Sequence, residues 1–209
     1  MIKCGRVNLR EAEIVDRPKI FRWLTHSDIT PSIMGEPTYP DHLIPTWKEF
    51  QQDYSDSYFK NTGNDKGRNF IILLGNTEIG TIGYDNLDKQ LCQVDIDIWM
   101  REERYCGQGY GTEALNCMVD HLHALYGIRT FRLDPSARNT RAIRAYEKAG
   151  FQIDKKFVWN RRPDYRDGVS MKREITEGVV ADRSRLQEGY RSKGRSEGRL
   201  QGARKRAGS

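Results

Sequence analysis

Three glycines at alternate positions separate a strand pattern from a helix pattern in the middle of the chain. Gly107, Gly109 and Gly111 follow an alternating apolar segment at residues 94–98 and precede a long run of helical spacing. Glycine lets successive backbone N–H groups turn toward one point, and the helix that follows adds the positive end of its dipole. Such a turn is typical of a pocket for an anion such as pyrophosphate, although backbone geometry alone can also require glycines here.

The residues after these glycines show the clearest helical spacing in the chain. The apolar positions recur every three or four residues, which places them on one face of a helix. They are Ala114, Leu115, Met118, Val119, Leu122 and Leu125. Gly127 follows, and a glycine there allows the left-handed conformation that ends many helices. We therefore expect this helix to end near residue 127.

Strand patterns dominate much of the remaining chain. Short alternating or apolar runs predict strands at residues 7–10, 69–74, 79–85, 91–100, 128–133, 151–159 and 169–172. Turn signals at residues 75–76 and 86–88 separate three of these strands, which predicts an antiparallel meander. Residues 31–45 contain four prolines and are expected to form a loop.

Three further helices are predicted. The first, capped by Asp16, carries Ile20, Phe21 and Leu24 on one side. The second has an aromatic face, more typical of a core than of a binding platform: Trp47, Phe50, Tyr54 and Tyr58. The last, capped by Asn139 and closed by Gly150, turns its apolar side inward: Ala142, Ile143, Tyr146 and Ala149. The order of elements predicts an α/β fold of mixed α+β type, with about four helices covering a mixed, mostly antiparallel sheet of six to seven strands.

Positive charge is concentrated at the C-terminal end. The 209 residues have a formal net charge of +6, and residues 177–209 alone hold nine Lys or Arg and four Asp or Glu. Residues 1–176, predicted to form one domain, are therefore nearly neutral. The tail at residues 177–209 is rich in Gly, Ser and Arg, has few apolar groups and is predicted to be mobile. A basic arm that touches RNA is the alternative for this tail, and no other nucleic-acid partner is expected.

The composition and the residue spacing also argue against a membrane protein and against a metal site. No run of about 18 apolar residues is present, and residues 1–6 lack the hydrophobic segment of a secretory signal, so no membrane partner and a cytoplasmic location are expected. The cysteines are far apart without C-x-x-C spacing, and all are predicted to be free thiols: Cys4, Cys92, Cys106 and Cys117. His121 and His123 would point about 200° apart on one helix, so no metal site is expected.

A dinucleotide-binding turn is the rival interpretation of the glycines. Residues 109–114 fit the pattern G-x-G-x-x-A, and Asp134 follows after the next strand. However, the preceding strand alternates with Asp95 and Asp97, whereas a central parallel strand would be continuously apolar. Residues 101–106 also separate that strand from the glycines, and too little chain follows to complete a doubly wound sheet. These features argue against a dinucleotide site.

The same residues resemble a known family. Residues 107–115, Gly-Gln-Gly-Tyr-Gly-Thr-Glu-Ala-Leu, look like the acetyl-CoA motif of the GNAT superfamily of N-acetyltransferases, and residues 139–151 look like its second signature. Two motifs at the expected distance make the resemblance specific. It covers roughly residues 5–175 and implies acetyl-CoA as the acetyl donor. It also implies a V-shaped splay between two central strands, where the pantetheine arm inserts.

Within that superfamily, the chain is most similar to the aminoglycoside 6′-N-acetyltransferases, through residues 133–136, Asn139 and residues 141–143. Three departures are present. The usual Arg or Gln before the glycines is Cys106 here, which removes one side-chain contact to phosphate but leaves the backbone donors. The loop after the first helix has residues 32–35 where the aminoglycoside enzymes often carry tryptophans. A short hairpin, in place of a long acidic insertion, joins the third and fourth strands. The loop and the hairpin bear on the antibiotic substrate and not on acetyl transfer.

An amine must lose a proton before it attacks a thioester, so a carboxylate, or a water held by one, is required near the acetyl carbon. The resemblance places the family's strand aspartate at Asp97, which shares a strand face with Asp95 and is the predicted base. Its second acidic residue falls on Asp134, the other predicted catalytic carboxylate. Together with Glu36, these three aspartates are predicted to line an acidic acceptor site. Exposed edge residues and an ordinary turn aspartate are the structural alternatives.

The resemblance also implies Tyr146 as the acid that protonates the departing thiolate, although core packing is the usual role of such a tyrosine. A backbone N–H on residues 98–100 is expected to polarise the acetyl carbonyl. The expected acetyl-CoA contacts are Ile98, Trp99, Met100, Gly107, Gln108, Gly109, Tyr110, Gly111, Thr112, Asn139, Ala142 and Tyr146.

Three functional hypotheses follow. The first is an N-acetyltransferase acting on a primary amine of a small polycationic acceptor such as an aminoglycoside. The second is an enzyme that acetylates protein N-terminal amines. The third is a non-catalytic acyl-CoA-binding or RNA-associated module. A monomer and a homodimer are both compatible with the sequence.

Overall fold

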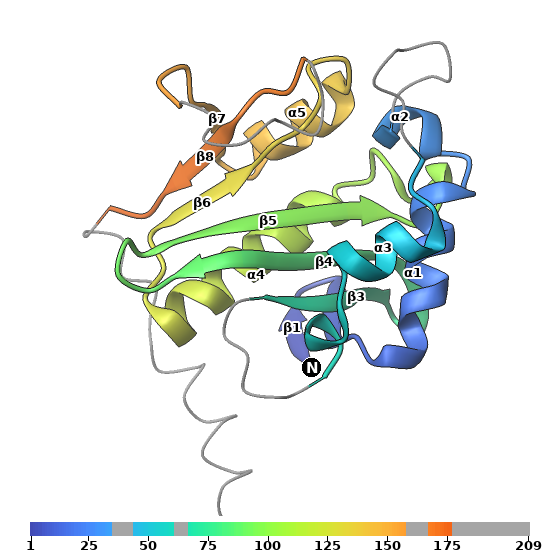
Figure 1. The fold of residues 1–209 in the computed structure, drawn as a ribbon. Coiled ribbons are helices and arrows are strands. Elements are labelled where there is room, and N and C mark those ends of the chain that lie inside the picture. The colour runs from blue at the N-terminus through green and yellow to red at the C-terminus, as the bar shows by residue number, and fades with distance from the viewer. Residues whose placement is uncertain (35–43, 61–66, 158–166, 177–209) are drawn as a thin grey trace, which may run out of the picture. The chain divides into compact units, whose positions relative to one another are not determined.

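The described residues of the chain form one sheet of eight strands in the computed structural model (Figure 1). The structure describes residues 1–34, 44–60, 67–157 and 167–176. The strands are β1 (Ile2–Cys4), β2 (Val7–Glu11), β3 (Arg68–Leu74), β4 (Thr77–Asp88), β5 (Gln93–Met100), β6 (Thr130–Leu133), β7 (Gln152–Ile153) and β8 (Met171–Glu174). Their order in the sheet is β1-β2-β3-β4-β5-β6-β8-β7, and every neighbouring pair is antiparallel except β5 and β6.

This architecture confirms the mixed, mostly antiparallel sheet, including the meander of β3, β4 and β5. The expected count of six to seven strands is too low, because β1 is only three residues long and shows no periodicity in sequence. The strand predicted at residues 151–159 is too long. Its described part is β7, which covers only Gln152–Ile153, and residues 158–159 lie outside the described residues. The single parallel pair excludes the doubly wound sheet of the rival interpretation.

Five α-helices and three short 3-10 helices lie in the described part of the chain. They are η1 (Ile14–Asp16), α1 (Arg17–Thr25), α2 (Thr30–Met34), α3 (Trp47–Asp53), η2 (Asp56–Tyr58), η3 (Glu103–Tyr105), α4 (Tyr110–Tyr126) and α5 (Thr140–Lys148). α2 extends into the predicted loop, because Pro31 stands in the first helical turn, where its missing N–H costs nothing. The aromatic helix is also shorter than predicted. It ends at Asp53, and Tyr58 follows on η2.

Asp16 does not cap α1 with its side chain as predicted. The side chain is buried, and its carboxylate accepts hydrogen bonds from Arg10 (2.9 Å) and from the Glu13 backbone N–H (2.8 Å), and pairs with Lys19 at 2.9 Å. Burial by itself raises the pKa of Asp16, but these donors outweigh it and lower the pKa to about 2. The carboxylate therefore ties β2 to the start of α1.

Helices cover both faces of the sheet, and Figure 1 shows α4 behind it and α3 in front of it. On β5 the side chains alternate as predicted. Val94 and Ile96 are buried toward α4, whose buried residues are Ala114, Leu115, Met118, Val119 and Leu122. Trp99 points to the other face, where it joins a core cluster with α1 and Phe50 of α3. Leu125, predicted on the apolar side of α4, is exposed.

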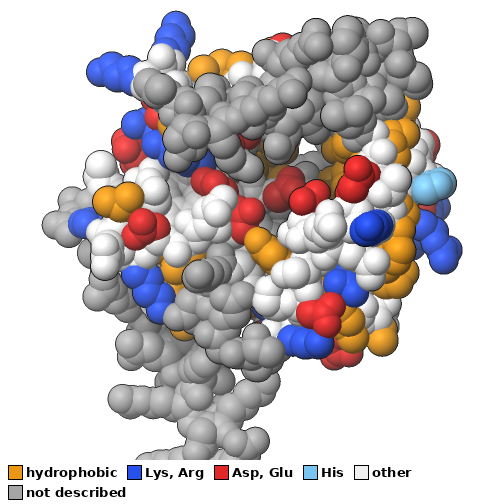
Figure 2. Space-filling model, in the orientation of Figure 1, with side chains coloured by type: hydrophobic (Ala, Val, Ile, Leu, Met, Phe, Trp, Pro, Cys, Tyr) orange, Lys and Arg blue, Asp and Glu red, His pale blue; other side chains and the backbone are white. Residues whose placement is uncertain are grey.

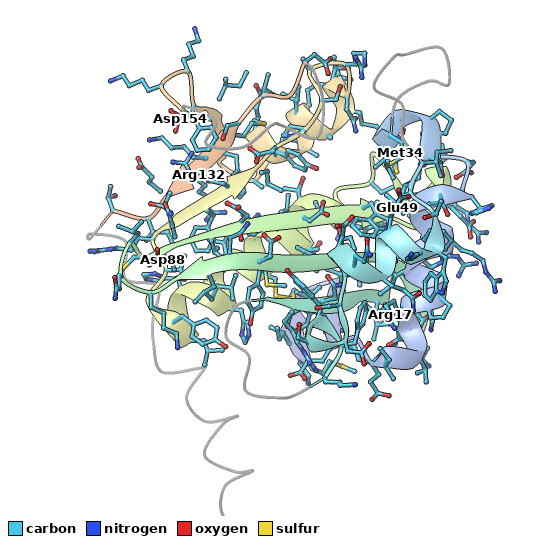
Figure 3. The ribbon with its side chains drawn as sticks, viewed as in Figure 1. Arg17, Met34, Glu49, Asp88, Arg132 and Asp154 are labelled. Atoms are coloured by element: carbon cyan, nitrogen blue, oxygen red, sulfur yellow. A yellow bond between two sulfur atoms is a disulfide. The ribbon has the colours of Figure 1, made fainter. Side chains whose placement is uncertain are left out.

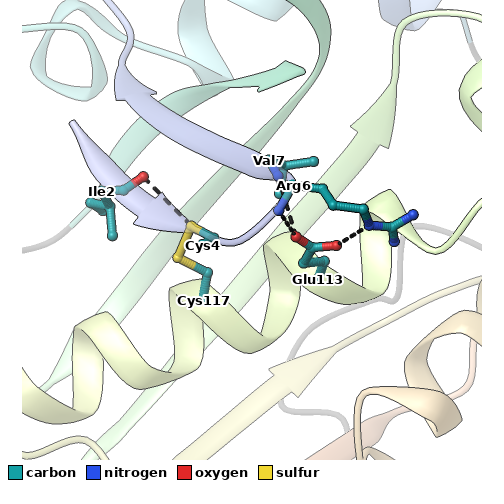
Figure 4. The surroundings of a disulfide bond; sticks show 6 residues. All are labelled: Ile2, Cys4, Arg6, Val7, Glu113 and Cys117. Carbon is teal, nitrogen blue, oxygen red and sulfur yellow. Dashed lines mark hydrogen bonds and ion pairs between the residues drawn. A yellow bond between two sulfur atoms is a disulfide. The ribbon is translucent and has the colours of Figure 1, made fainter. Parts of the chain in front are cut away.

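A disulfide between Cys4 and Cys117 joins β1 to α4 (Figure 4). The prediction of four free thiols is therefore wrong for this pair. These two cysteines are 113 residues apart in the sequence, and only the packing of β1 against α4 brings their Cα atoms within 5.5 Å. Cys92 and Cys106 are free thiols, as predicted.

The structure divides into two units, Met1–Glu174 and Ile175–Ser209. Of the second unit only residues 175–176 are described, so the predictions for the tail lie outside the described residues. In the described part of the chain, no helix has the length and apolar character needed to cross a membrane.

Candidate active site

The central strands β5 and β6 separate after a short parallel ladder. Pairing runs only from Gln93 with Thr130 to Asp95 with Arg132. β5 then continues to Met100, while β6 pairs with β8 on its other side. Figure 1 shows the two strands diverging toward their C-terminal ends. This divergence is the V-shaped splay that the sequence resemblance implied.

The glycine segment forms the turn that leads from the C-terminal end of β5, through η3, into α4. Gly107 and Gly109 have positive φ angles of 70° and 86°. The first hydrogen bond of α4 runs from the Glu113 N–H to the Gly109 carbonyl (3.0 Å), so the N–H groups of residues 110–112 lie outside the helical ladder. Together with the helix dipole, these donors favour an anion at the open end of the splay.

The space around the glycines fits a ligand that approaches the backbone closely. Positive φ explains the glycine at two of the three positions, but not at Gly111. A Cβ built on Gly111 would lie 3.9 Å from Ile98 Cδ1 and Met100 Sδ, which is ordinary contact, and a Cβ on Gly107 would meet nothing within 4 Å. Packing inside the protein therefore does not require Gly111, which is consistent with its predicted contact to acetyl-CoA.

The second sequence motif meets the first in space. Asn139 caps α5 as predicted, and its side chain accepts a hydrogen bond from the Ala142 N–H (3.1 Å). The Thr112 hydroxyl, in the first turn of α4, donates to the Ala145 carbonyl of α5 (3.1 Å). Thr112 thus uses its hydroxyl to join two helices, which leaves its backbone N–H for the predicted phosphate contact. Tyr146 follows Ala145 on α5.

The apolar side of α5 is only half-buried, although it was predicted to point inward. Ala142, Ile143 and Tyr146 are all partly exposed, and only Ala149, just after the helix, is buried. An apolar side that stays partly uncovered next to the start of α4 is compatible with the predicted contacts of α5 to acetyl-CoA. The assignment of Ala142 and Tyr146 to the cofactor stays a prediction.

Three aspartates share the face of the sheet opposite α4. Asp95 and Asp97 project from β5 on this face, and Asp85 of β4 is the direct cross-strand partner of Asp95. Gly83 stands opposite Asp97. Asn86 donates a hydrogen bond to Asp95 (2.9 Å). Figure 2 shows Asp and Glu side chains gathered around a hollow on the side of the molecule that carries β5.

Tyr54 donates a hydrogen bond of 2.5 Å to Asp97 Oδ2. Burial and, after it, the charge of Asp97 raise the pKa of Tyr54 well above its usual value, so the phenol stays protonated and remains a donor. The ring centroid of Tyr58 lies 6.0 Å away, and burial and Asp85 raise the pKa of Tyr58. The aromatic face predicted to be core therefore also forms one wall of the acidic site. No local pattern reveals this contact, because it depends on how α3 packs on β5.

The structure places Asp134 across the splay from Asp97. Each residue stands two positions beyond the last β5–β6 pair, Asp95 with Arg132. Asp97 lies on β5, and Asp134 directly follows β6. The Arg132 guanidinium bonds to Asp154 (3.1 Å). Both residues are labelled in Figure 3. The two predicted catalytic aspartates thus lie on opposite arms of the V. Their roles stay predictions, and Glu36, the remaining predicted acceptor residue, lies outside the described residues.

The strand residues expected to contact acetyl-CoA point in different directions. Ile98 and Met100 face Gly111, on the α4 side of β5. Trp99 points to the opposite face, where its side chain is 5% exposed within the core. Trp99 can therefore reach the cofactor only through its backbone. No group of three or more metal-ligating side chains occurs in the described residues. His123, one of the two histidines considered above, instead hydrogen-bonds to the Ile128 carbonyl (2.7 Å).

Residues 6–152 match the family model described as an acetyltransferase (GNAT) domain. This chain belongs to the GNAT acetyltransferase family. The enzyme class expected from the sequence, an acyltransferase with acetyl-CoA as donor, is therefore confirmed at the level of the family.

Two curated relatives act on different amines. The spermine/spermidine N(1)-acetyltransferase of Bacillus subtilis (strain 168) is 34% identical over 77 residues, which cover 37% of this chain and 50% of that protein. The aminoglycoside N(6′)-acetyltransferase type 1 of Klebsiella pneumoniae is 27% identical over 156 residues, which cover 70% of this chain and 74% of that protein. The match thus spans about half the length of one relative and three quarters of the other.

Solved structures of an aminoglycoside acetyltransferase and of a spermidine acetyltransferase share the fold of this chain. The structure of AAC(6′)-Ib with paromomycin and acetyl-CoA is 23% identical with a TM-score of 0.65, and the match covers 85% of this chain and 99% of that one. The spermidine N-acetyltransferase of Vibrio cholerae with CoA and spermine is 20% identical with a TM-score of 0.59, and the match covers 80% and 95%. At these identities the comparison concerns the fold alone.

Proposed function

We propose that this chain transfers the acetyl group of acetyl-CoA to a primary amine of a small polycationic acceptor, an aminoglycoside or a polyamine. The observation that carries this proposal is the set of three aspartates, Asp85, Asp95 and Asp97, on one face of β4 and β5 at the splay. The relatives named for spermine and for aminoglycosides support the same acceptor class.

Like charges directly opposite each other on neighbouring strands are unfavourable. Asp85 and Asp95 form such a pair, and Asp97 adds a third carboxylate two residues along β5. An acceptor with several ammonium groups would relieve this repulsion, whereas a neutral or singly charged amine would leave part of it in place. The arrangement therefore favours polyvalent cations.

Asp97 is the proposed base. The hydrogen bond from Tyr54, which orients the Asp97 carboxylate on β5, supports this assignment. The carboxylate takes a proton from the acceptor ammonium, directly or through a water, and the freed nitrogen attacks the acetyl carbon. Asp134, on the other arm of the splay, would hold a second ammonium of the same acceptor.

The remaining steps fall to groups near the glycine turn. Acetyl-CoA supplies a thioester whose carbon–sulfur bond breaks after the nitrogen has added. A backbone N–H of residues 98–100 would stabilise the charge on the acetyl oxygen, and Tyr146 would donate its hydroxyl proton to the departing sulfur. Tyr146 suits this role because it follows Ala145, whose carbonyl accepts from Thr112 in the first turn of α4.

A thiol-release assay with acetyl-CoA and a panel of amines tests this proposal. The panel contains kanamycin, spermine, spermidine, a short peptide with a free N-terminus, and a monoamine of similar length to spermidine. We expect turnover with at least one polycation and at least tenfold lower kcat/KM with the monoamine and the peptide. A preference for the peptide would support an N-terminal acetyltransferase, and turnover of none of these amines would refute the proposal.

A further inference from the structure

The turn between β1 and β2 packs against the first turn of α4. The Glu113 carboxylate accepts hydrogen bonds from the backbone N–H groups of Arg6 and Val7, the latter at 3.2 Å, and from Arg6 Nε at 2.9 Å (Figure 4). Gly5 is required in this turn, because its φ is +90° and a Cβ there would lie 2.8 Å from the Glu113 carboxylate. One carboxylate thus fixes both the backbone and the side chain of the turn.

This contact holds the Arg6 guanidinium at the glycine segment. Arg6 Nη2 lies 3.4 Å from the Gln108 carbonyl and 3.2 Å from the position a Cβ would take on Gly109. The guanidinium carbon lies 4.9 Å from the centre of the Tyr110 ring. The side chain is nevertheless 58% exposed, and no acceptor among the described residues is bonded to its Nη1. Arg6 therefore presents N–H donors beside the turn that receives an anion.

The glycine segment lacks the side-chain donor, Arg or Gln, that its sequence motif usually carries. Cys106 stands at that position. Among the described arginines near the turn, Arg6 bonds to the glycine segment itself, at the Gln108 carbonyl, whereas Arg104 and Arg141 pair with acidic side chains at η3. Arg104 pairs with Glu102 (2.7 Å), and Arg141 pairs with Glu103. A pyrophosphate bound only by backbone N–H groups would therefore keep much of its charge uncompensated, and an arginine from another element can supply the missing compensation.

We propose that Arg6 is a further cofactor-binding residue, whose guanidinium bonds to the pyrophosphate of acetyl-CoA in place of the missing motif side chain. The proposal rests on the use of acetyl-CoA described above. Glu113 holds the backbone of the turn and occupies Arg6 Nε, which leaves the terminal N–H groups of Arg6 for the phosphates. Arginine suits this task because its planar group donates to two partners at once.

A purely structural role for Arg6 is the competing explanation. In that case Arg6 would only hold the β1–β2 turn on α4 through Glu113, and loss of either residue would have the same effect. The two explanations predict different CoA affinities for the Glu113→Gln variant. Glutamine keeps an oxygen that accepts the backbone N–H groups of the turn, but removes a negative charge that competes with phosphate for Arg6.

Titration calorimetry on the full chain, with CoA and with dephospho-CoA, tests the proposal. We expect Arg6→Ala to weaken both ligands by the same factor, about 10- to 100-fold, as for the loss of a hydrogen bond to a charged group. Arg6→Lys should lose less CoA affinity than Arg6→Ala, because lysine keeps the positive charge although it lacks the planar guanidinium group. Glu113→Gln should bind CoA as tightly as the wild type or more tightly. Arg104→Ala, which removes the same charge near the same turn, is the matched control and should change the affinity less than threefold.

Several outcomes would overturn the proposal. Unchanged affinity in Arg6→Ala would do so, as would an equal loss in Glu113→Gln and Arg6→Ala, which would assign Arg6 a structural role. A loss with CoA but not with dephospho-CoA would place the contact on the 3′-phosphate and not on the pyrophosphate. If the wild type bound no CoA, the proposed function would fail as well, which separates that result from failure of the Arg6 assignment. Thermal melts establish that each variant is folded.

Discussion

Tyr54 donates a 2.5 Å hydrogen bond to Asp97 and thereby joins the end of α3 to the middle of β5. The contact gives the aromatic residues of α3 and η2 two roles. Phe50 is buried in the core with α1, while Tyr54 turns its hydroxyl to the predicted base. The acceptor site is therefore built partly from the core that supports it.

Removal of the Tyr54 hydroxyl should lower activity without unfolding the protein. We expect Tyr54→Phe to reduce kcat/KM for the polycationic acceptor by about tenfold, since a hydrogen bond to a charged group contributes about 1.5–3 kcal/mol. Steady-state kinetics and a thermal melt measure the two effects. Tyr58→Phe removes a hydroxyl from the same aromatic wall and is the control. An equal loss in both variants would contradict a specific role for the Tyr54 contact.

Asp97→Asn should abolish most of the turnover and leave CoA binding intact. A positioned general base contributes about 10²- to 10⁴-fold to the rate, and asparagine cannot accept the proton. The measurement is single-turnover acetyl transfer, combined with calorimetry for CoA. Asp120→Asn, an exposed change on α4, is the matched control. Wild-type rates in Asp97→Asn would exclude this residue as the base.

Gly111→Ala should separate stability from cofactor binding. The new methyl group would make only ordinary contacts with Ile98 and Met100, and alanine is favoured over glycine in a helix by about 1 kcal/mol. We therefore expect an unchanged or higher melting temperature. The methyl group would occupy the corner between α4 and β5 where the predicted cofactor contacts meet, so CoA affinity should fall. A variant that melts normally and binds CoA normally would show that Gly111 is not part of the cofactor site.

Reduction of the disulfide between Cys4 and Cys117 should destabilise the chain. The bond closes a loop between residues separated by 113 positions, and loops of this size gain about 4–5 kcal/mol in the chain-entropy model. A thermal melt with and without reductant measures the loss. In denaturant without reductant, a thiol reagent should label only Cys92 and Cys106. Labelling of all four cysteines would contradict the bond.

The acid stability of the protein should depend on Asp16. Its folded pKa of about 2 lies below the unfolded value of about 3.9, so the stabilisation is present above about pH 4 and is lost as pH falls toward 2. The difference corresponds to about 2.6 kcal/mol. Asp16→Asn should therefore be less stable at neutral pH and lose less stability between pH 4 and pH 2. Urea titrations at several pH values measure both effects, and parallel pH curves for the two proteins would contradict the linkage.

Much of the fold could be predicted from spacing along the chain. The meander of β3 to β5, the helix that ends at Gly127 and the cap at Asn139 follow from local rules, because the side-chain period of a strand or helix shows directly in sequence. One error lies where the chemistry of a helix cap competed with other charged partners nearby. Asp16 has the chemistry of a helix cap, but Arg10 and Lys19 engage its carboxylate instead.

The sequence by itself determined the two motifs, the glycine turn and the shared face of Asp95 and Asp97. Each of these depends only on residues a few positions apart in one element. Tertiary structure alone decided which groups meet across elements, since no periodicity records a contact between residues 43 or more positions apart. Such contacts are Tyr54 with Asp97, Arg6 with Glu113, and Cys4 with Cys117. The residue types of the candidate site could therefore be predicted from the sequence. The contacts that orient these residues depend on how the helices and strands pack.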